Sequence, residues 1–215
     1  MGIALEKVTV LHRWRREVPV VQERVETLLL LAREHGFVRL SSEGMIRLGW
    51  SRAEQGAVEE GLADLYQGLV ALRTTGVVLT LSELLAMLAE TYGKGGRADE
   101  GLGVLVEALT VVDKSGERFW EAELYRLKGE LLLVLSPDNK AEAETCFRQA
   151  LATTRHQQAK SLELRVAMSL SRLWQHQGKR DEARQLLAGV YGWFTEGFDT
   201  ADLQEAKALL EELPQ

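Results

Sequence analysis

Small residues recur along this chain at a nearly constant step, and this recurrence restricts the fold more than any other feature. One series is Gly49, Ala89, Gly129 and Ser171, with spacings of 40, 40 and 42 residues. A second series is Gly61, Gly101, Ala143 and Ala183, with spacings of 40, 42 and 40 residues. Two series with the same step indicate an internal repeat in which each copy is one supersecondary unit.

Each copy is predicted to be a pair of antiparallel helices. An apolar stretch precedes a turn that contains glycine, or the longer turn 136–139 in the fourth copy, and a second apolar stretch follows. Two such helices approach closely only where one of them lacks bulk, which explains the small residues. A large apolar residue four positions after each member of the second series fills the neighbouring space. These residues are Leu65, Leu105, Phe147 and Leu187.

The repeats account for the whole chain, which we therefore expect to be a single repeat domain over residues 1–215. The sequence holds only 3 Pro, and its abundant Leu, Ala, Glu and Arg favour helices. The expected repeats are 5–36, 41–76, 79–115, 118–157 and 160–195. A last helix over 200–213, with Asp199 or Thr200 as its N-cap, is expected to cover the end of the array. Trp193, Phe194 and Phe198 are expected to pack beneath it, and the alternative is that they join two copies of the chain.

The repeats resemble the tetratricopeptide repeat (TPR) pattern. The third copy carries Leu88-Ala89, Tyr92, Gly96, Gly101 and Ala108 at the positions of that pattern. Arg52 replaces the aromatic residue in the second copy, and the 40-residue step exceeds the usual length of about 34. The resemblance implies an all-α, right-handed TPR-like superhelix (an α-solenoid) of about five helix pairs plus a capping helix. HEAT-like stacking is the alternative, because its repeats have a longer step.

Several phrases are similar to a narrower group. GWSRAEQG, AEAETCFRQAL and YGWFTEGFDTADLQEAKALLEEL resemble the C-terminal TPR region of large bacterial adenylate or guanylate cyclase–ATPase signalling regulators. This resemblance implies a sensor or scaffold region that controls upstream cyclase- or ATPase-type domains. The catalytic domains of that group are not part of this sequence, so their activities do not carry over.

No pattern in the chain predicts catalysis, a metal or a cofactor. The stretch 93–101 is glycine-rich but lacks the order of a phosphate-binding loop, and the four histidines form no ligand motif. Cys146 is the only cysteine, so no internal disulfide can form, and we expect it to be a small buried residue. A net charge of -6 without a basic cluster argues against nucleic acid. No segment predicts a membrane span or a secretory signal, which favours the cytoplasm.

The concave face is the candidate binding site, because the first helix of each pair lines that face in a TPR array. The TPR pattern places on it Trp50, Glu54, Glu90, Lys94, Arg126, Glu130, Arg172, Gln175 and His176. Trp50 is either an exposed anchor or a residue buried against the next repeat. Any single charged position has a simpler alternative as part of a solvated helix face. The mixed charges do not match the Lys/Asn clamp of TPR chaperone adaptors.

These observations predict a non-catalytic interaction, scaffold or regulatory sensor module that binds a protein or peptide in its groove. The alternative is a sensor that binds a small ligand inside the superhelix.

Overall fold

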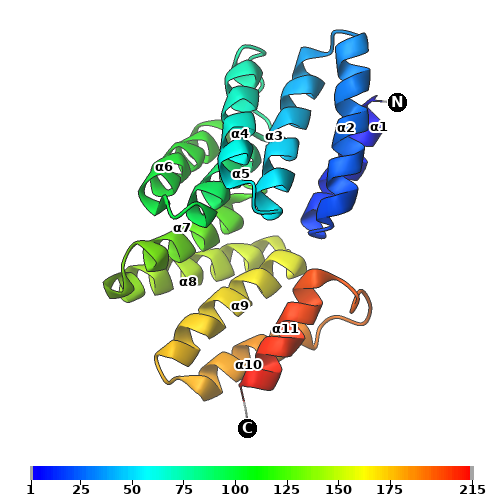
Figure 1. The fold of residues 1–215 in the computed structure, drawn as a ribbon. Coiled ribbons are helices and arrows are strands. Elements are labelled where there is room, and N and C mark those ends of the chain that lie inside the picture. The colour runs from blue at the N-terminus through cyan, green and yellow to red at the C-terminus, as the bar shows by residue number, and fades with distance from the viewer. Residues whose placement is uncertain (1, 214–215) are drawn as a thin grey trace. The chain divides into compact units, whose positions relative to one another are not determined.

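The computed structural model describes residues 2–213, and every regular element in that range is helical (Figure 1). The expectation of an all-α chain is therefore confirmed. The helices fall into two compact units, Met1–Glu117 and Arg118–Gln215. No helix within residues 2–213 combines the length and the apolar character that crossing a bilayer requires.

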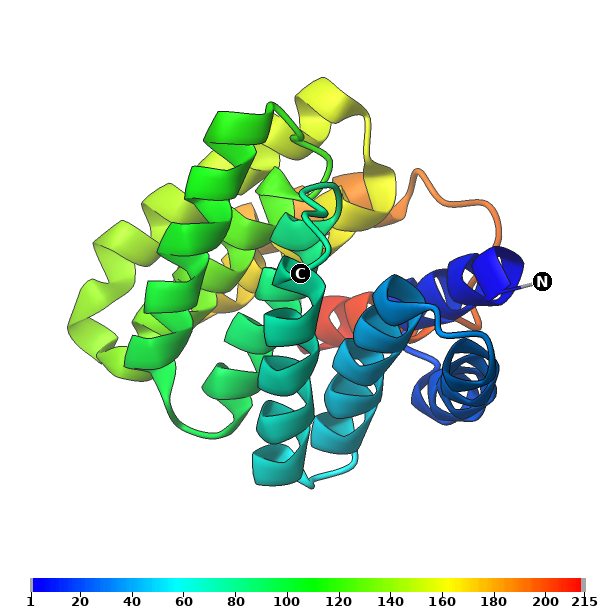
Figure 2. The same ribbon diagram turned by 90° about the horizontal axis from the view of Figure 1, so that it is seen from above.

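Three helix pairs form the first unit. They are α1 (Gly2–Trp14) with α2 (Val18–Glu34), α3 (Val38–Glu54) with α4 (Val58–Arg73), and α5 (Leu81–Lys94) with α6 (Ala98–Ser115). Figures 1 and 2 show the partners of each pair lying side by side, as their contacts require.

Two further pairs and a last helix form the second unit. They are α7 (Glu121–Leu135) with α8 (Lys140–Gln157), α9 (Lys160–His176) with α10 (Arg180–Tyr191), and α11 (Ala201–Glu212). A short 3-10 turn, η1 (Pro137–Asn139), lies in the longer connection that the sequence shows in the fourth copy. There the Ser136 hydroxyl accepts a hydrogen bond from the Asp138 amide, at 3.2 Å. The Asn139 side-chain amide donates to the Leu132 carbonyl at 3.0 Å, which closes the end of α7.

The small residues of the two series meet each other inside the helix pairs. A Cβ atom added to Gly49 would lie 2.5 Å from the Gly61 carbonyl oxygen, and one added to Gly61 would lie 2.5 Å from the Gly49 carbonyl oxygen. In the fifth pair, the Ser171 hydroxyl donates to the Ala183 carbonyl at 3.0 Å. The recurring small residues therefore stand where the two backbones of a pair cross.

Bulky residues fill the space next to these crossings. Phe147 is fully buried, and its ring lies 2.5 Å from where a Cβ on Gly129 would stand. Leu65, Leu105 and Leu187 are also fully buried. The interlocking of a small residue with a large one fixes the spacing of each helix pair.

The helix α11 covers the last pair with an aliphatic face. Leu203, Ala206 and Leu209 join Leu187 and Val190 in one buried cluster. Thr200 is the N-cap residue, although its hydroxyl donates to the Gly197 carbonyl and makes no capping hydrogen bond.

The expectation that three aromatic residues pack beneath this helix is wrong for two of them. Trp193 is 59% exposed and Phe198 is 48% exposed, whereas Phe194 packs against the cluster. The aliphatic side chains of α11 cover the face of the last pair, and the centre of the Trp193 ring lies instead 5.9 Å from the Lys160 ammonium group.

Candidate partner-binding surface

The residues predicted for the groove all lie on the first helices of their pairs. Some belong to the first compact unit and the others to the second. Trp50 and Glu54 are on α3, and Glu90 and Lys94 are on α5. The second unit carries Arg126 and Glu130 on α7, and Arg172, Gln175 and His176 on α9.

Trp50 is a packed residue in the first unit. Its side chain is 3% exposed, and the Arg13 guanidinium lies 5.8 Å from the centre of its ring. This burial supports the alternative in which the indole packs inside the array. Glu54 and Lys94 form a short ion pair that joins α3 to α5, and Glu90 is half-buried.

A third 40-residue series runs through the same helices, and the sequence analysis missed it. Glu43, Glu83, Glu123 and Glu163 each stand in the early part of a first helix, and each is no more than 5% exposed. Their regular spacing was the available signal. The spacing alone does not indicate burial, because acidic residues near helix N-termini are normally exposed to solvent.

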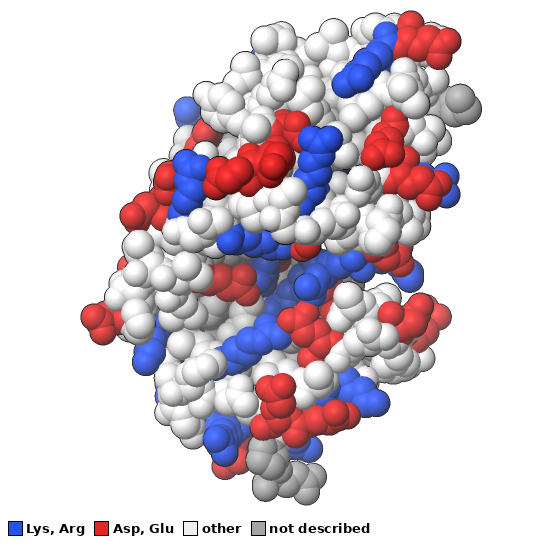
Figure 3. Space-filling view, in the orientation of Figure 1, with Lys and Arg blue, Asp and Glu red and all other residues white. Residues whose placement is uncertain are grey.

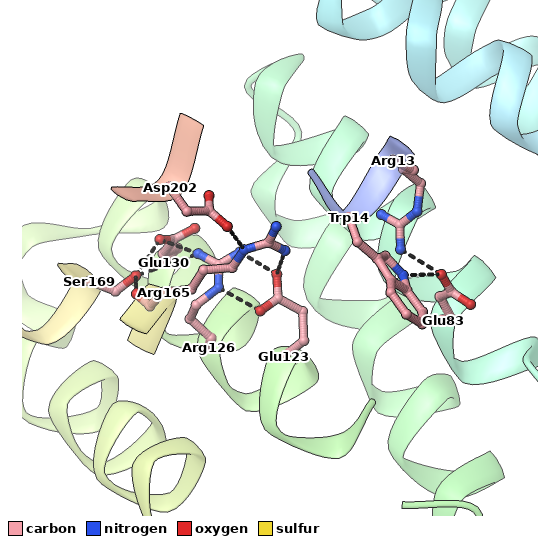
Figure 4. A network of polar contacts seen from close by, with 9 residues as sticks. All are labelled: Arg13, Trp14, Glu83, Glu123, Arg126, Glu130, Arg165, Ser169 and Asp202. Atoms are coloured by element: carbon pink, nitrogen blue, oxygen red, sulfur yellow. Dashed lines mark hydrogen bonds and ion pairs between the residues drawn. The ribbon is translucent and has the colours of Figure 1, made fainter. Parts of the chain in front are cut away.

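In the first unit, buried arginines bind Glu83 and Glu6, whereas Glu43 accepts a hydrogen bond from the half-exposed Arg39 at 2.9 Å. The Arg13 guanidinium donates to Glu83 Oε1 at 2.7 Å, and the Trp14 indole donates to the same oxygen at 3.0 Å (Figure 4). Arg47 is 1% exposed and donates to Glu6 at 3.0 Å. These bonds join α1 to α5 and α1 to α3, so the cluster ties the three first helices together.

The electrostatics keep Glu83 ionised. Burial by itself would raise the pKa of its carboxyl group, but the nearby Arg13 and Arg47 guanidiniums outweigh burial and lower that pKa below 4.5. A charged carboxylate in this position matches the charged guanidiniums around it.

The second unit carries a charged row that is open to solvent at its ends. Arg126 makes a two-pronged contact with Glu123 at 2.7 and 2.8 Å, and it pairs with Glu130 at 2.5 Å. The Ser169 hydroxyl donates to Glu130 at 2.7 Å, and the Arg165 guanidinium donates to the Asp202 carboxylate at 2.7 Å. Figure 4 shows these side chains converging from α7, α9 and α11.

Further along α9, the row reaches the surface. Arg172 donates to Glu205 of α11 at 2.5 Å, and the two side chains are 39% and 37% exposed. The side chain of Glu130 is also 39% exposed. His176 is exposed, with its Nδ1 atom 2.7 Å from the Arg172 carbonyl, and Gln175 is half-buried. The structure thus brings Arg126 together with Glu130, and Arg172 with His176.

Acidic and basic side chains are interspersed on the molecular face drawn in Figure 3. Within residues 2–213, no group of three or more His, Cys, Asp or Glu residues is arranged to hold a metal ion. Cys146 is buried, and burial raises the pKa of its thiol. The surface is suited to charge-assisted hydrogen bonding with a partner of mixed charge.

Comparison with known proteins places this architecture among TPR proteins. No family model matches the chain. An uncharacterized protein of Rhizobium meliloti strain 1021 is 28% identical over 142 residues, which are 66% of this chain and only 14% of that protein. The chain therefore spans a small part of this relative.

Two solved structures resemble the chain over almost its whole length. Bacillus thuringiensis PlcR, in complex with the peptide PapR7 and DNA, has a TM-score of 0.77 and 10% identity, over 99% of this chain and 73% of that one. A signal transduction ATPase with numerous domains (STAND) and a tetratricopeptide repeat sensor, from Pyrococcus horikoshii, has a TM-score of 0.73 and 15% identity, over 99% of this chain and 32% of that one. These likenesses confirm the predicted TPR-like fold of five helix pairs and a C-terminal helix.

Proposed function

We propose that this chain is a non-catalytic interaction or sensor module that binds a peptide or a segment of a protein along its first helices. The observation that carries the proposal is the charged row on α7 and α9, whose outer members Glu130 and Arg172 are partly exposed. In this proposal residues 1–215 act as one repeat domain in the cytoplasm.

The structural relatives support this function. PlcR was crystallised with a peptide, and the repeats of the Pyrococcus protein are described as a sensor. The Rhizobium relative is much longer than the stretch that it shares with this chain. We therefore propose that the module serves signalling, and that it reports to cyclase- or ATPase-type effector domains of the kind that the sequence resemblance implies.

The partner that suits this surface is a polar peptide with charges of both signs. Arg172 offers two-pronged hydrogen bonding to a carboxylate, and Glu130 offers an acceptor for Lys or Arg. Both already have partners within the unit, at Glu205 and at Arg126 with Ser169. A bound peptide would replace these ion pairs within the unit by ion pairs with its own side chains. Because contacts are exchanged and not simply added, we expect the charged residues to contribute specificity and not high affinity.

A peptide-selection experiment tests this proposal. A displayed library of random peptides is panned against the chain, and the binding of enriched peptides is then measured for Arg172→Ala. We expect a loss of about tenfold or more, the usual effect of removing a central charged contact. The control is Arg73→Ala on α4, because this side chain is 46% exposed and, like Arg172, donates to a carboxylate of another helix, here Glu107 of α6.

The outcome separates the candidate functions. If the enriched peptides bind Arg172→Ala and the control variant equally well, the binding site lies away from α7 and α9. If no peptide is enriched, and instead a small-molecule library shifts the melting temperature in an Arg172-dependent manner, the alternative of a small-ligand sensor replaces the peptide-binding proposal.

A further inference from the structure

The outer face of the first helix pair is apolar and exposed. On α1, Val8 is 42% exposed and Leu11 is 52% exposed, and Ala4 is also open to solvent. Ala4, Leu5 and Val8 border a cleft of about 350 Å³, whose lining also includes Arg24, Thr27 and Leu31 of α2. A group of aliphatic side chains is unfavourable in water, because the free energy that their burial would contribute is not gained.

The 40-residue step shows what this face corresponds to in the rest of the array. The positions equivalent to Ala4, Val8 and Leu11 are buried or half-buried in the later first helices. They are Gly44, Leu48 and Ser51 in α3, Leu84, Leu88 and Thr91 in α5, and, after the two-residue insertion, Val166, Leu170 and Leu173 in α9.

In each of these three helices, the preceding pair covers the face. The helix α2 packs on α3, α4 packs on α5, and α8 packs on α9. The contact on α3 is close, because a Cβ on Gly44 would lie 3.0 Å from a methyl group of Leu29. Leu28 of α2 also reaches this point, at 3.6 Å. The interface between α2 and α3 therefore places neighbouring leucines over a small residue.

We propose that the outer face of α1 and α2 is a repeat-docking surface, and that its occupant is a helix pair preceding residue 1 in a longer polypeptide. The second helix of that pair carries adjacent aliphatic residues that lie over Ala4, in the way that Leu28 and Leu29 lie over Gly44. The surface continues a packing of a second helix on the next first helix that already occurs three times within the two units.

A duplication of the first repeat tests the proposal. Residues 1–40 are fused directly ahead of residue 1, which preserves the 40-residue step and gives the outer face a helix with known docking side chains. We expect the added segment to unfold together with the first unit, at a melting temperature higher by roughly 4 °C or more. Amide exchange in the original α1 should slow at least about tenfold.

The substitutions Val8→Lys and Leu11→Lys in the original α1 provide the matched control. In the 215-residue chain these side chains are exposed, so the double variant should keep the melting temperature within about 2 °C. In the extended chain it should abolish the rise and restore fast exchange. Val106→Lys on α6, at a side chain that is 62% exposed, should leave the rise intact.

Two results would overturn the proposal. One is an added segment that unfolds or is digested independently while the melting temperature of the first unit stays unchanged. The other is a 215-residue chain that sediments as a dimer and becomes monomeric with Leu11→Lys, which would make a second copy the occupant.

Discussion

Replacing Gly49 with alanine should destabilise the first unit, although alanine is the better helix former. The added Cβ would lie 2.5 Å from the Gly61 carbonyl oxygen and 2.9 Å from the Leu65 amide nitrogen. Both neighbours are backbone atoms of α4, so no side chain can rotate away to make room. The helices α3 and α4 must separate or shift.

The size of the effect follows from two opposing terms. Alanine in a helix interior is favoured over glycine by roughly 0.5–1 kcal/mol, because glycine loses more conformational freedom on folding. Overpacking typically costs about 1–3 kcal/mol, and a clash with two backbone atoms of the neighbouring helix belongs at the upper end of that range. We therefore expect a net loss of about 2 kcal/mol in the free energy of unfolding. The melting temperature should fall by roughly 4–8 °C.

Urea unfolding followed by far-ultraviolet circular dichroism measures this change. The matched control is Gly103→Ala on α6, where a Cβ meets nothing within 4 Å. That variant should gain roughly 0.5–1 kcal/mol, because only the helix-propensity term applies. If Gly49→Ala is neutral or stabilising like the control, the close crossing of α3 and α4 does not explain the glycine.

Three further predictions concern buried groups. Glu83→Gln should lower the urea midpoint at pH 7, and the difference from the unaltered protein should shrink as the pH falls below about 4.5. The reason is that Arg13 and Arg47 outweigh burial and lower the pKa of Glu83 in the folded state. The ionised carboxylate therefore stabilises the fold at pH values above its pKa in the unfolded chain, and this stabilisation is lost as the pH falls through the folded-state pKa. A difference in urea midpoint that is unchanged at pH 3 would contradict this account. The Cys146 thiol should react with an aromatic disulfide reagent only as the second unit opens, since burial raises its pKa; a fast reaction of the native protein would disagree. Leu209→Ala, at a side chain of α11 that is 4% exposed, should cost about 2–4 kcal/mol in thermal or urea unfolding, whereas Val134→Ala, which is 58% exposed, should change little.

The repeat period was readable because glycine and alanine recur wherever two backbones cross. The crossing of Gly49 with Gly61 has this cause, and so has the insertion of Phe147 against Gly129. A short-range pattern of small, large and turn residues is a property of the sequence itself. For that reason the fold class and the C-terminal helix were predictable without coordinates.

The candidate site was less accessible to sequence reasoning. The TPR pattern placed Arg126 and Arg172 on the correct helices, but it could not assign their partners. Glu123 lies 3 residues before Arg126 on the same helix, α7, whereas Glu205 lies 33 residues after Arg172, on α11. Charged side chains are long and flexible, so their pairing depends on the packing of helices that are distant in sequence.

The sequence by itself determined that helices pair and stack every 40 residues, because only residues without bulk permit the backbones to cross. Tertiary structure decided which charged residues are buried. Glu83 and Arg13 are 70 residues apart, and only the packing of α1 with the other first helices brings them to 2.7 Å and removes them from water. The burial of Trp50 and the exposure of Trp193 were decided in the same way, by which neighbouring helix covers each ring.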